Sequence, residues 1–173
     1  MRYRLTWMVL MAAGAGMACG VTLAAQVAAV DDDAAKAQIR RDVDTYMQSV
    51  DDADPKLAAT IWLTTPAASF IEPLGHGRGW DAIVSVVYVK LMGQTFSKRT
   101  LKNVNDVTIH LYGDAAVVEF DWDFLATLHS DGRTQIHTSR RESQMYVKFP
   151  DKGWRLVRVH YSGPPVKGPG EGF

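Results

Sequence analysis

Apolar residues recur at helical spacing in the first half of the chain. On one face of residues 31–50 lie Ile39, Val43, Tyr46, Met47 and Val50. This spacing, together with an acidic start that suits the positive end of a helix dipole, predicts a helix. Asp54-Pro55 then places a capping side chain before a proline at the first helical position, which predicts a short helix over residues 55–63. Residues 80–94 are rich in β-branched residues, but their length and apolar spacing favour a third helix.

The remaining segments have the composition or the period of strands. Residues 68–73 are predicted to form a short strand, and residues 74–79 a glycine-rich turn. From residue 103 onwards, apolar and polar side chains alternate, which predicts strands over residues 103–113 and 114–132. In the second of these, Val118, Phe120, Trp122 and Phe124 alternate with Glu119, Asp121 and Asp123. Asp131-Gly132 predicts a hairpin, and two further strands follow over residues 133–149 and 154–163.

The predicted order is helix, helix, strand, helix and then four consecutive antiparallel strands. This order is typical of an α+β domain in which helices cover one face of a curved sheet. Residues 154–163 are predicted to be the edge or the last strand of that sheet. Its two faces would carry Arg158, His160 and Ser162 on one side, and Val157, Val159 and Tyr161 on the other. Residues 166–173 are rich in proline and glycine and are predicted to form a flexible tail.

The N-terminal segment has the features of an export signal. Arg2 and Arg4 precede a long uncharged stretch that ends in small residues, which predicts a signal peptide over residues 1–29, cleaved after Ala25 or Ala29. The predicted location is therefore periplasmic or secreted. Two alternatives stay open: a retained membrane anchor, which would be the only contact with a membrane, and lipidation at Cys19, although the leucine expected three residues earlier is missing.

Removal of the leader changes the charge and the cysteine count. The whole chain has 19 basic and 19 acidic residues, and the leader contains two arginines and the single cysteine. The mature chain would therefore be slightly acidic and free of cysteine, which excludes disulfides and thiol nucleophiles. A chain of near-neutral charge also gives no reason to expect nucleic-acid binding, which normally needs a basic face.

Four segments resemble, in the same order, the association domain of calcium/calmodulin-dependent protein kinase II. They are FIEPLGHG (70–77), TIHLYGDAA (108–116), DGRTQIHTSRRE (131–142) and GWRLVRVHYSGPP (153–165). This domain belongs to the nuclear transport factor 2-like (SnoaL-like) superfamily, whose fold is a cone of helices packed on a curved, mostly antiparallel sheet. The resemblance covers residues 36–165, nearly the whole mature chain. It implies a homodimer formed by sheet-to-sheet packing, or a larger ring, with a pocket inside each cone, but no kinase activity.

The residues of the expected pocket depart from those of the kinase family. That family lines the pocket with arginines, whereas Gln135, His137 and Met145 stand at the corresponding positions of the Thr-Ser segment. A polar cavity is therefore implied, but not an identical anionic ligand. Its predicted lining comprises Glu72, His137, Ser139, Arg141, Arg158 and His160. Such a wall suits a carboxylate or another small anion. The alternative is a structural ladder of ion pairs with Glu119, Asp121, Asp123 and Glu142.

The leading hypothesis is a small-ligand-binding or oligomer-assembly module, with an anionic or apolar ligand. The alternative is a cofactor-free isomerase, lyase or hydrolase in which Asp121 or Asp123 acts as the base in the same cavity, and a tyrosine such as Tyr46, Tyr88 or Tyr112 as the oxyanion donor. Equally, the acidic residues of that strand form a solvated face. The histidines lack metal-ligand spacing, so neither a metal nor a cofactor is expected. A purely structural oligomer is the third possibility.

Overall fold

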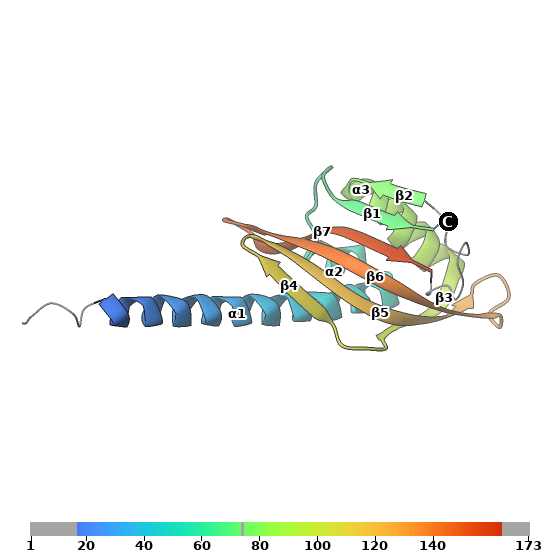
Figure 1. Ribbon diagram of the computed structural model, residues 1–173. Helices are drawn as coiled ribbons and strands as arrows, with labels where there is room; N and C mark the ends of the chain where they lie inside the picture. Colours follow the sequence, from blue (N-terminus) through green and yellow to red (C-terminus); the bar gives the residue numbers. More distant parts are fainter. Residues whose placement is uncertain (1–16, 74, 164–173) are drawn as a thin grey trace, which may run out of the picture. The chain divides into compact units, whose positions relative to one another are not determined.

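A computed structural model describes residues 17–73 and 75–163, with side chains described from residue 31 onwards. The helices are α1 (Met17–Asp51), α2 (Pro55–Ala59), α3 (Trp80–Ile83) and the π-helix η1 (Val84–Thr95). The strands are β1 (Ser69–Glu72), β2 (Gly75–Arg78), β3 (Phe96–Asn103), β4 (Thr108–Tyr112), β5 (Ala115–Leu128), β6 (Gln135–Phe149) and β7 (Gly153–Ser162). The chain divides into two compact units at Ala34 and Ala35, and the second unit contains all seven strands (Figure 1).

The predicted helices are present, with different bounds. α1 begins at Met17 rather than at residue 31, and it includes Gly20. α2 has the predicted cap, since the Asp54 carboxylate accepts hydrogen bonds from the backbone N–H groups of Lys56 and Leu57, but it ends at Ala59. The predicted third helix continues from α3 into η1. Among the described residues, no helix combines the length and apolar character that crossing a membrane requires.

The strands form one curved sheet that confirms the α+β fold. Its order is β2-β1-β7-β6-β5-β3, with β4 also paired to β5, and only the β1–β7 pair is parallel. Of the two predicted positions for residues 154–163, the last strand is confirmed and the edge of the sheet is wrong. β7 is the last strand along the chain, but it lies inside the sheet because β1 pairs with its free side.

Two strands differ from the sequence-based expectation. Residues 74–79 were expected to form a turn, yet β2 pairs antiparallel to β1, with Ile71 opposite His76. β3 was not predicted at all and pairs with the second half of β5. Only Phe96 and Leu101 are buried in β3, so its sequence lacks a clear period of two. Both strands owe their conformation to pairing with a neighbour rather than to an apolar pattern of their own.

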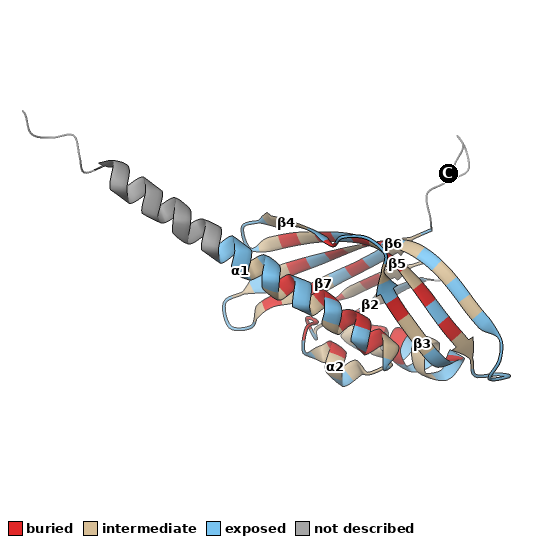
Figure 2. Ribbon diagram, turned by 90° about the horizontal axis from the view of Figure 1, so that it is seen from below, coloured by how far each residue is buried: buried red, intermediate tan, exposed pale blue. Residues whose placement is uncertain are grey.

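The core lies between the helices and the inner face of the sheet. Buried and exposed positions alternate along the long strands (Figure 2), and in β5 the buried set includes the predicted Val118, Phe120, Trp122 and Phe124. In β7 a bulge shifts the register near Leu156. As a result Leu156 and Val159 are both buried, and Val157 does not share the inner face as predicted. The inner face of the sheet thus carries the core and leaves a hollow at one end.

Candidate functional site

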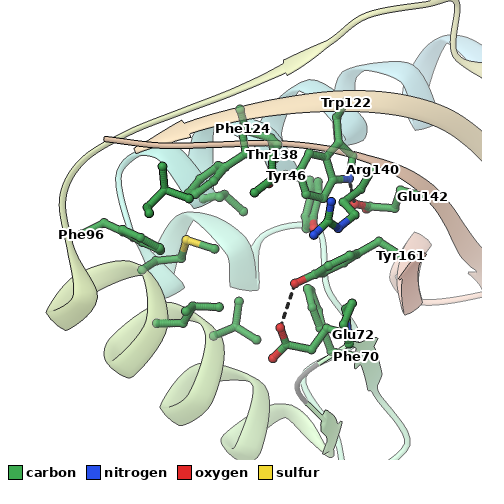
Figure 3. Close-up of a pocket in the computed structure, with 17 residues that line it drawn as sticks. Tyr46, Phe70, Glu72, Phe96, Trp122, Phe124, Thr138, Arg140, Glu142 and Tyr161 are labelled. Carbon is green, nitrogen blue, oxygen red and sulfur yellow. Dashed lines mark hydrogen bonds between the residues drawn. The ribbon is translucent and has the colours of Figure 1, made fainter. Parts of the chain in front are cut away.

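The inner face of the sheet encloses a cavity of about 260 Å³ with the helices. Its lining comes from α1, β1, η1, β3, β5, β6 and β7, and most of it is apolar. The polar side chains that line it are Tyr46, Glu72, Thr138, Arg140, Glu142 and Tyr161 (Figure 3). A mostly apolar hollow with a few convergent polar groups is the usual form of a small-molecule site. The prediction of a polar cavity was therefore wrong, because most of the lining is apolar.

Apolar residues of η1 form one wall of the cavity. Val87, Leu91 and Met92 line it, while the neighbouring Tyr88 is buried behind them with its hydroxyl 3.0 Å from the Ser49 hydroxyl. π-Helical segments are rare and occur frequently at functional sites. Of the three tyrosines considered as oxyanion donors, only Tyr46 therefore reaches the cavity, because Tyr112 belongs to β4 and is 66% exposed.

Glu142 is the most deeply buried acid of the cavity, with 3% of its surface exposed. One carboxylate oxygen, Oε2, accepts a hydrogen bond of 2.8 Å from the Trp122 indole N–H, and Oε1 accepts one of 2.8 Å from the Gln144 amide. Burial raises the pKa of Glu142 to about 7, although hydrogen bonding by Gln144, Trp122 and Tyr46 lowers it. The carboxyl can therefore gain or lose a proton near neutral pH.

Glu72 lies on β1, across the cavity from β6. The Tyr161 hydroxyl donates a hydrogen bond of 2.8 Å to its carboxylate (Figure 3). Burial raises the pKa of Tyr161, and the hydrogen bond to Glu72 adds to this effect, so the phenol stays protonated and remains a donor. Glu72 is the one residue of the predicted ligand-binding set that lines the cavity.

Arg140 supplies the positive charge among the cavity-lining residues. Its guanidinium donates to the backbone carbonyl of Ser139 at 2.8 Å, and within the described residues no ion pair joins it to Glu72 or Glu142. With all three groups ionised, the lining therefore carries one net negative charge. Such a site gives a small anion less stabilisation than the predicted wall, which contained Arg141 and Arg158.

The family is decided by a comparison with protein-family models. A SnoaL-like domain model matches residues 31–160, most of the chain. The chain belongs to the SnoaL-like family. No functionally curated protein matches it.

Solved structures support the same fold for this SnoaL-like domain. A nuclear transport factor 2-like superfamily protein from Salmonella enterica is 47% identical, with a TM-score of 0.80 over 82% of this chain and 99% of that one. A putative dehydratase from Streptomyces avermitilis is 20% identical, with a TM-score of 0.66 over 78% and 99% of the two chains. A hexachlorocyclohexane dehydrochlorinase from Novosphingobium barchaimii is 16% identical, with a TM-score of 0.67 over 77% and 88%. The last two share the fold alone.

Most predicted site residues of the SnoaL-like domain lie on the outer face of the sheet, away from the cavity. His137, Ser139 and Arg141 alternate along β6 with the lining residues Thr138, Arg140 and Glu142, so they point to the other side. On β7 the exposed Arg158 and His160 likewise flank the buried Val159. On β5, Asp121 and Asp123 flank the buried Trp122. Except for Glu72, the predicted set therefore does not form the cavity wall.

The outer face nevertheless brings some of these residues together. Asp123 accepts a hydrogen bond from the Ser139 hydroxyl and lies 3.7 Å from His137 Nε2. Asp121 pairs through hydrogen bonds with Asn105, and it borders a shallow polar hollow of about 340 Å³ with Arg141 and His160. The alternative of an ion-pair ladder with arginines is wrong for the described residues, where no arginine pairs with an acidic side chain and His137 is the one basic side chain within 4 Å of a carboxylate. The described residues contain no acidic or histidine cluster suited to a metal ion.

Proposed function

We propose that this SnoaL-like domain binds a small, mostly apolar molecule in the cavity, as an exported protein. The observation that carries this proposal is the cavity of about 260 Å³, whose apolar walls surround a few fixed polar groups. A ligand of this kind gains free energy by removing apolar surface from water, and the polar groups fix its orientation. Export rests on the leader at residues 1–29, with cleavage after Ala25 or Ala29.

Filling the cavity tests this proposal. Thr138→Phe places an aromatic ring in the hollow, so we expect the affinity for toluene, measured by NMR titration, to fall at least tenfold. The matched control is Ser139→Phe, which adds the same ring to the outer face and should leave toluene binding unchanged. Equal affinities in the wild type and in Thr138→Phe would count against the cavity as the binding site.

Glu142 favours a second candidate function, an isomerase or lyase without a cofactor. Asp121 and Asp123 lie outside the cavity, whereas Glu142 lines it and has a pKa of about 7. In such a reaction its carboxylate removes a proton from carbon: the C–H bond breaks, an O–H bond forms, and the electron pair stays on the substrate. We expect the protein to catalyse exchange of the α-hydrogens of cyclohexanone in D₂O, at least tenfold faster than Glu142→Gln. Equal exchange rates would remove this candidate.

We also propose that the domain forms a homodimer, or a larger ring, through the outer face of the sheet. The resemblance to the kinase association domain supports this, and so does the distribution of charge. Arg78 and Arg158 belong to the strands at one side of the face, and Glu119 and Asp121 to β5 at the other. Two copies packed in opposite directions would bring unlike charges together. Sedimentation velocity of the mature protein tests the assembly, and a monomer at high micromolar concentration would contradict it.

A further inference from the structure

Three polar side chains follow one another along the inner face of β6. Glu142, Gln144 and Tyr146 are 3%, 1% and 0% exposed. The Tyr146 hydroxyl donates to Gln144 Oε1 at 2.8 Å, and Gln144 Nε2 donates to Glu142 Oε1 at 2.8 Å. Glu142 lines the cavity, whereas Gln144 and Tyr146 do not. A fully buried row of this kind is costly unless every member has a partner, so its geometry is strongly specified.

The row fixes the direction of each hydrogen bond. Burial raises the pKa of Tyr146 well above its ordinary value, so the phenol keeps its hydrogen and directs it to Gln144 Oε1. The amide of Gln144 must then turn its NH₂ group toward Glu142. The Trp122 indole is a donor only, and it occupies the other oxygen. Two fixed donors therefore hold the two oxygens of Glu142 as acceptors.

We propose, on the basis of the ligand-binding function above, that Gln144 and Tyr146 are positioning residues that hold Glu142 as a hydrogen-bond acceptor. The cavity then selects ligands that carry a hydrogen-bond donor, such as a hydroxyl or ammonium group, over ligands of the same shape that carry only an acceptor. A carboxylate has about four lone-pair sites; Trp122 and Gln144 occupy two of them, and the Tyr46 phenol approaches a third. A donor on the ligand uses another. A hydrogen-bond acceptor of the ligand at the same position would face the negative oxygens of Glu142 and would stay unpaired.

Two isomeric probes test whether the cavity prefers a hydrogen-bond donor. Benzyl alcohol and anisole have the same atoms and similar shapes, but only benzyl alcohol has a donor. Toluene serves as the apolar reference and benzoate as the anion. Affinities are measured by NMR titration of the mature protein at pH 8, where Glu142 is mainly ionised while Tyr46 and Tyr161, the neighbouring phenols from α1 and β7, remain protonated. We expect benzyl alcohol to bind about tenfold more tightly than anisole, as a hydrogen bond to a charged group implies.

Variants separate positioning from simple packing. Gln144→Met keeps a side chain of similar length but removes the donor, so Glu142 takes up a proton more readily and offers its own O–H to anisole. The preference for benzyl alcohol should then fall below threefold while toluene binding is kept. Tyr146→Phe preserves the ring, leaves the amide of Gln144 free to turn, and should give an intermediate ratio. Glu142→Gln should lose most of the preference. The matched control is Glu119→Gln, on the outer face of β5 and away from the cavity, which should leave the ratio of the benzyl alcohol and anisole affinities unchanged.

The outcomes distinguish this inference from the function on which it rests. If toluene binds but benzyl alcohol and anisole bind equally, the positioning role is wrong and the binding function stands. Tighter binding of benzoate than of benzyl alcohol would place the polar anchor at Arg140 and also overturn the inference. If none of the four probes binds, the proposed function fails and the inference fails with it. An unchanged ratio in both Gln144→Met and Tyr146→Phe would show that the row only packs.

Discussion

Replacing Arg99 with methionine is expected to lower the free energy of unfolding by about 3 kcal/mol. The half-buried guanidinium donates to three backbone carbonyls: Asp51 at 3.0 Å, and Met92 and Phe96 at 2.6 Å each. These carbonyls belong to the end of α1, the end of η1 and the start of β3. A single cation therefore completes two helix ends and joins them to the sheet, where it also opposes the negative ends of the helix dipoles.

Urea unfolding measures this effect, and two further variants interpret it. Lys98→Met changes the exposed neighbour on the same strand and should cost less than 0.5 kcal/mol. Arg99→Lys keeps the charge but has no planar fork, so it should recover only part of the loss. Because Met92 and Phe96 line the cavity, Arg99→Met should also weaken toluene binding. A loss no larger than that of Lys98→Met would show that water satisfies the three carbonyls equally well.

The sequence predicted the parts of the fold whose period is set by burial on one face. β5 is the best case, because every second residue from Ala116 to Ala126 is buried and the polar residues between them face outward. β2 and β3 were not predicted as strands, since their backbones are extended through pairing with β1 and β5 and few of their side chains are buried. Local sequence carries little information about pairing of this kind.

The candidate site was harder to predict than the fold because β6 is polar on both faces over much of its length. A shift by one residue moves a whole set of side chains from one face to the other, and the sequence alone favours the more basic set, with His137 and Arg141, as the cavity wall. The signal for the correct face was present at Ile136 and Tyr146. Counting by two from these apolar residues reaches Thr138, Arg140, Glu142 and Gln144.

The pairing of β5 with β6 across the hairpin identifies the same residues as the inner face of β6. With the turn at Asp131-Gly132, Phe124 lies opposite Thr138 and Trp122 opposite Arg140, so the buried face of β5 identifies the inner face of β6. The depth of Glu142, by contrast, depends on α1, whose Tyr46 covers the inner face of the sheet beside it, and on the neighbouring strand β7. No pattern along β6 contains that information, and so its altered pKa was not foreseen.

That altered pKa gives the second large prediction, a fall in stability of the wild type from acid to neutral pH. The pKa of Glu142 is about 7 in the folded protein, against an ordinary value of 4.5 that applies to the unfolded chain. Between these values the folded state keeps a proton that the unfolded state has released, so raising the pH favours unfolding. The contribution is fully present below pH 4.5 and is lost by about pH 7, which amounts to about 3 kcal/mol.

Comparison with Glu142→Gln isolates this contribution. Asp42, whose burial raises its pKa to about 6, titrates in the same range, but it does so in both proteins and cancels from the difference. The phenols of Tyr46, Tyr146 and Tyr161 have raised pKa values and stay protonated throughout. The free energy of unfolding of the wild type, relative to the variant, should therefore fall steadily from pH 4.5 to pH 7 and then level off. Glu119→Gln, on the outer face, should keep the wild-type profile. Parallel profiles for the wild type and Glu142→Gln would mean that Glu142 ionises as an ordinary solvated carboxyl, and the proposed role of Glu142 as a base would then be contradicted.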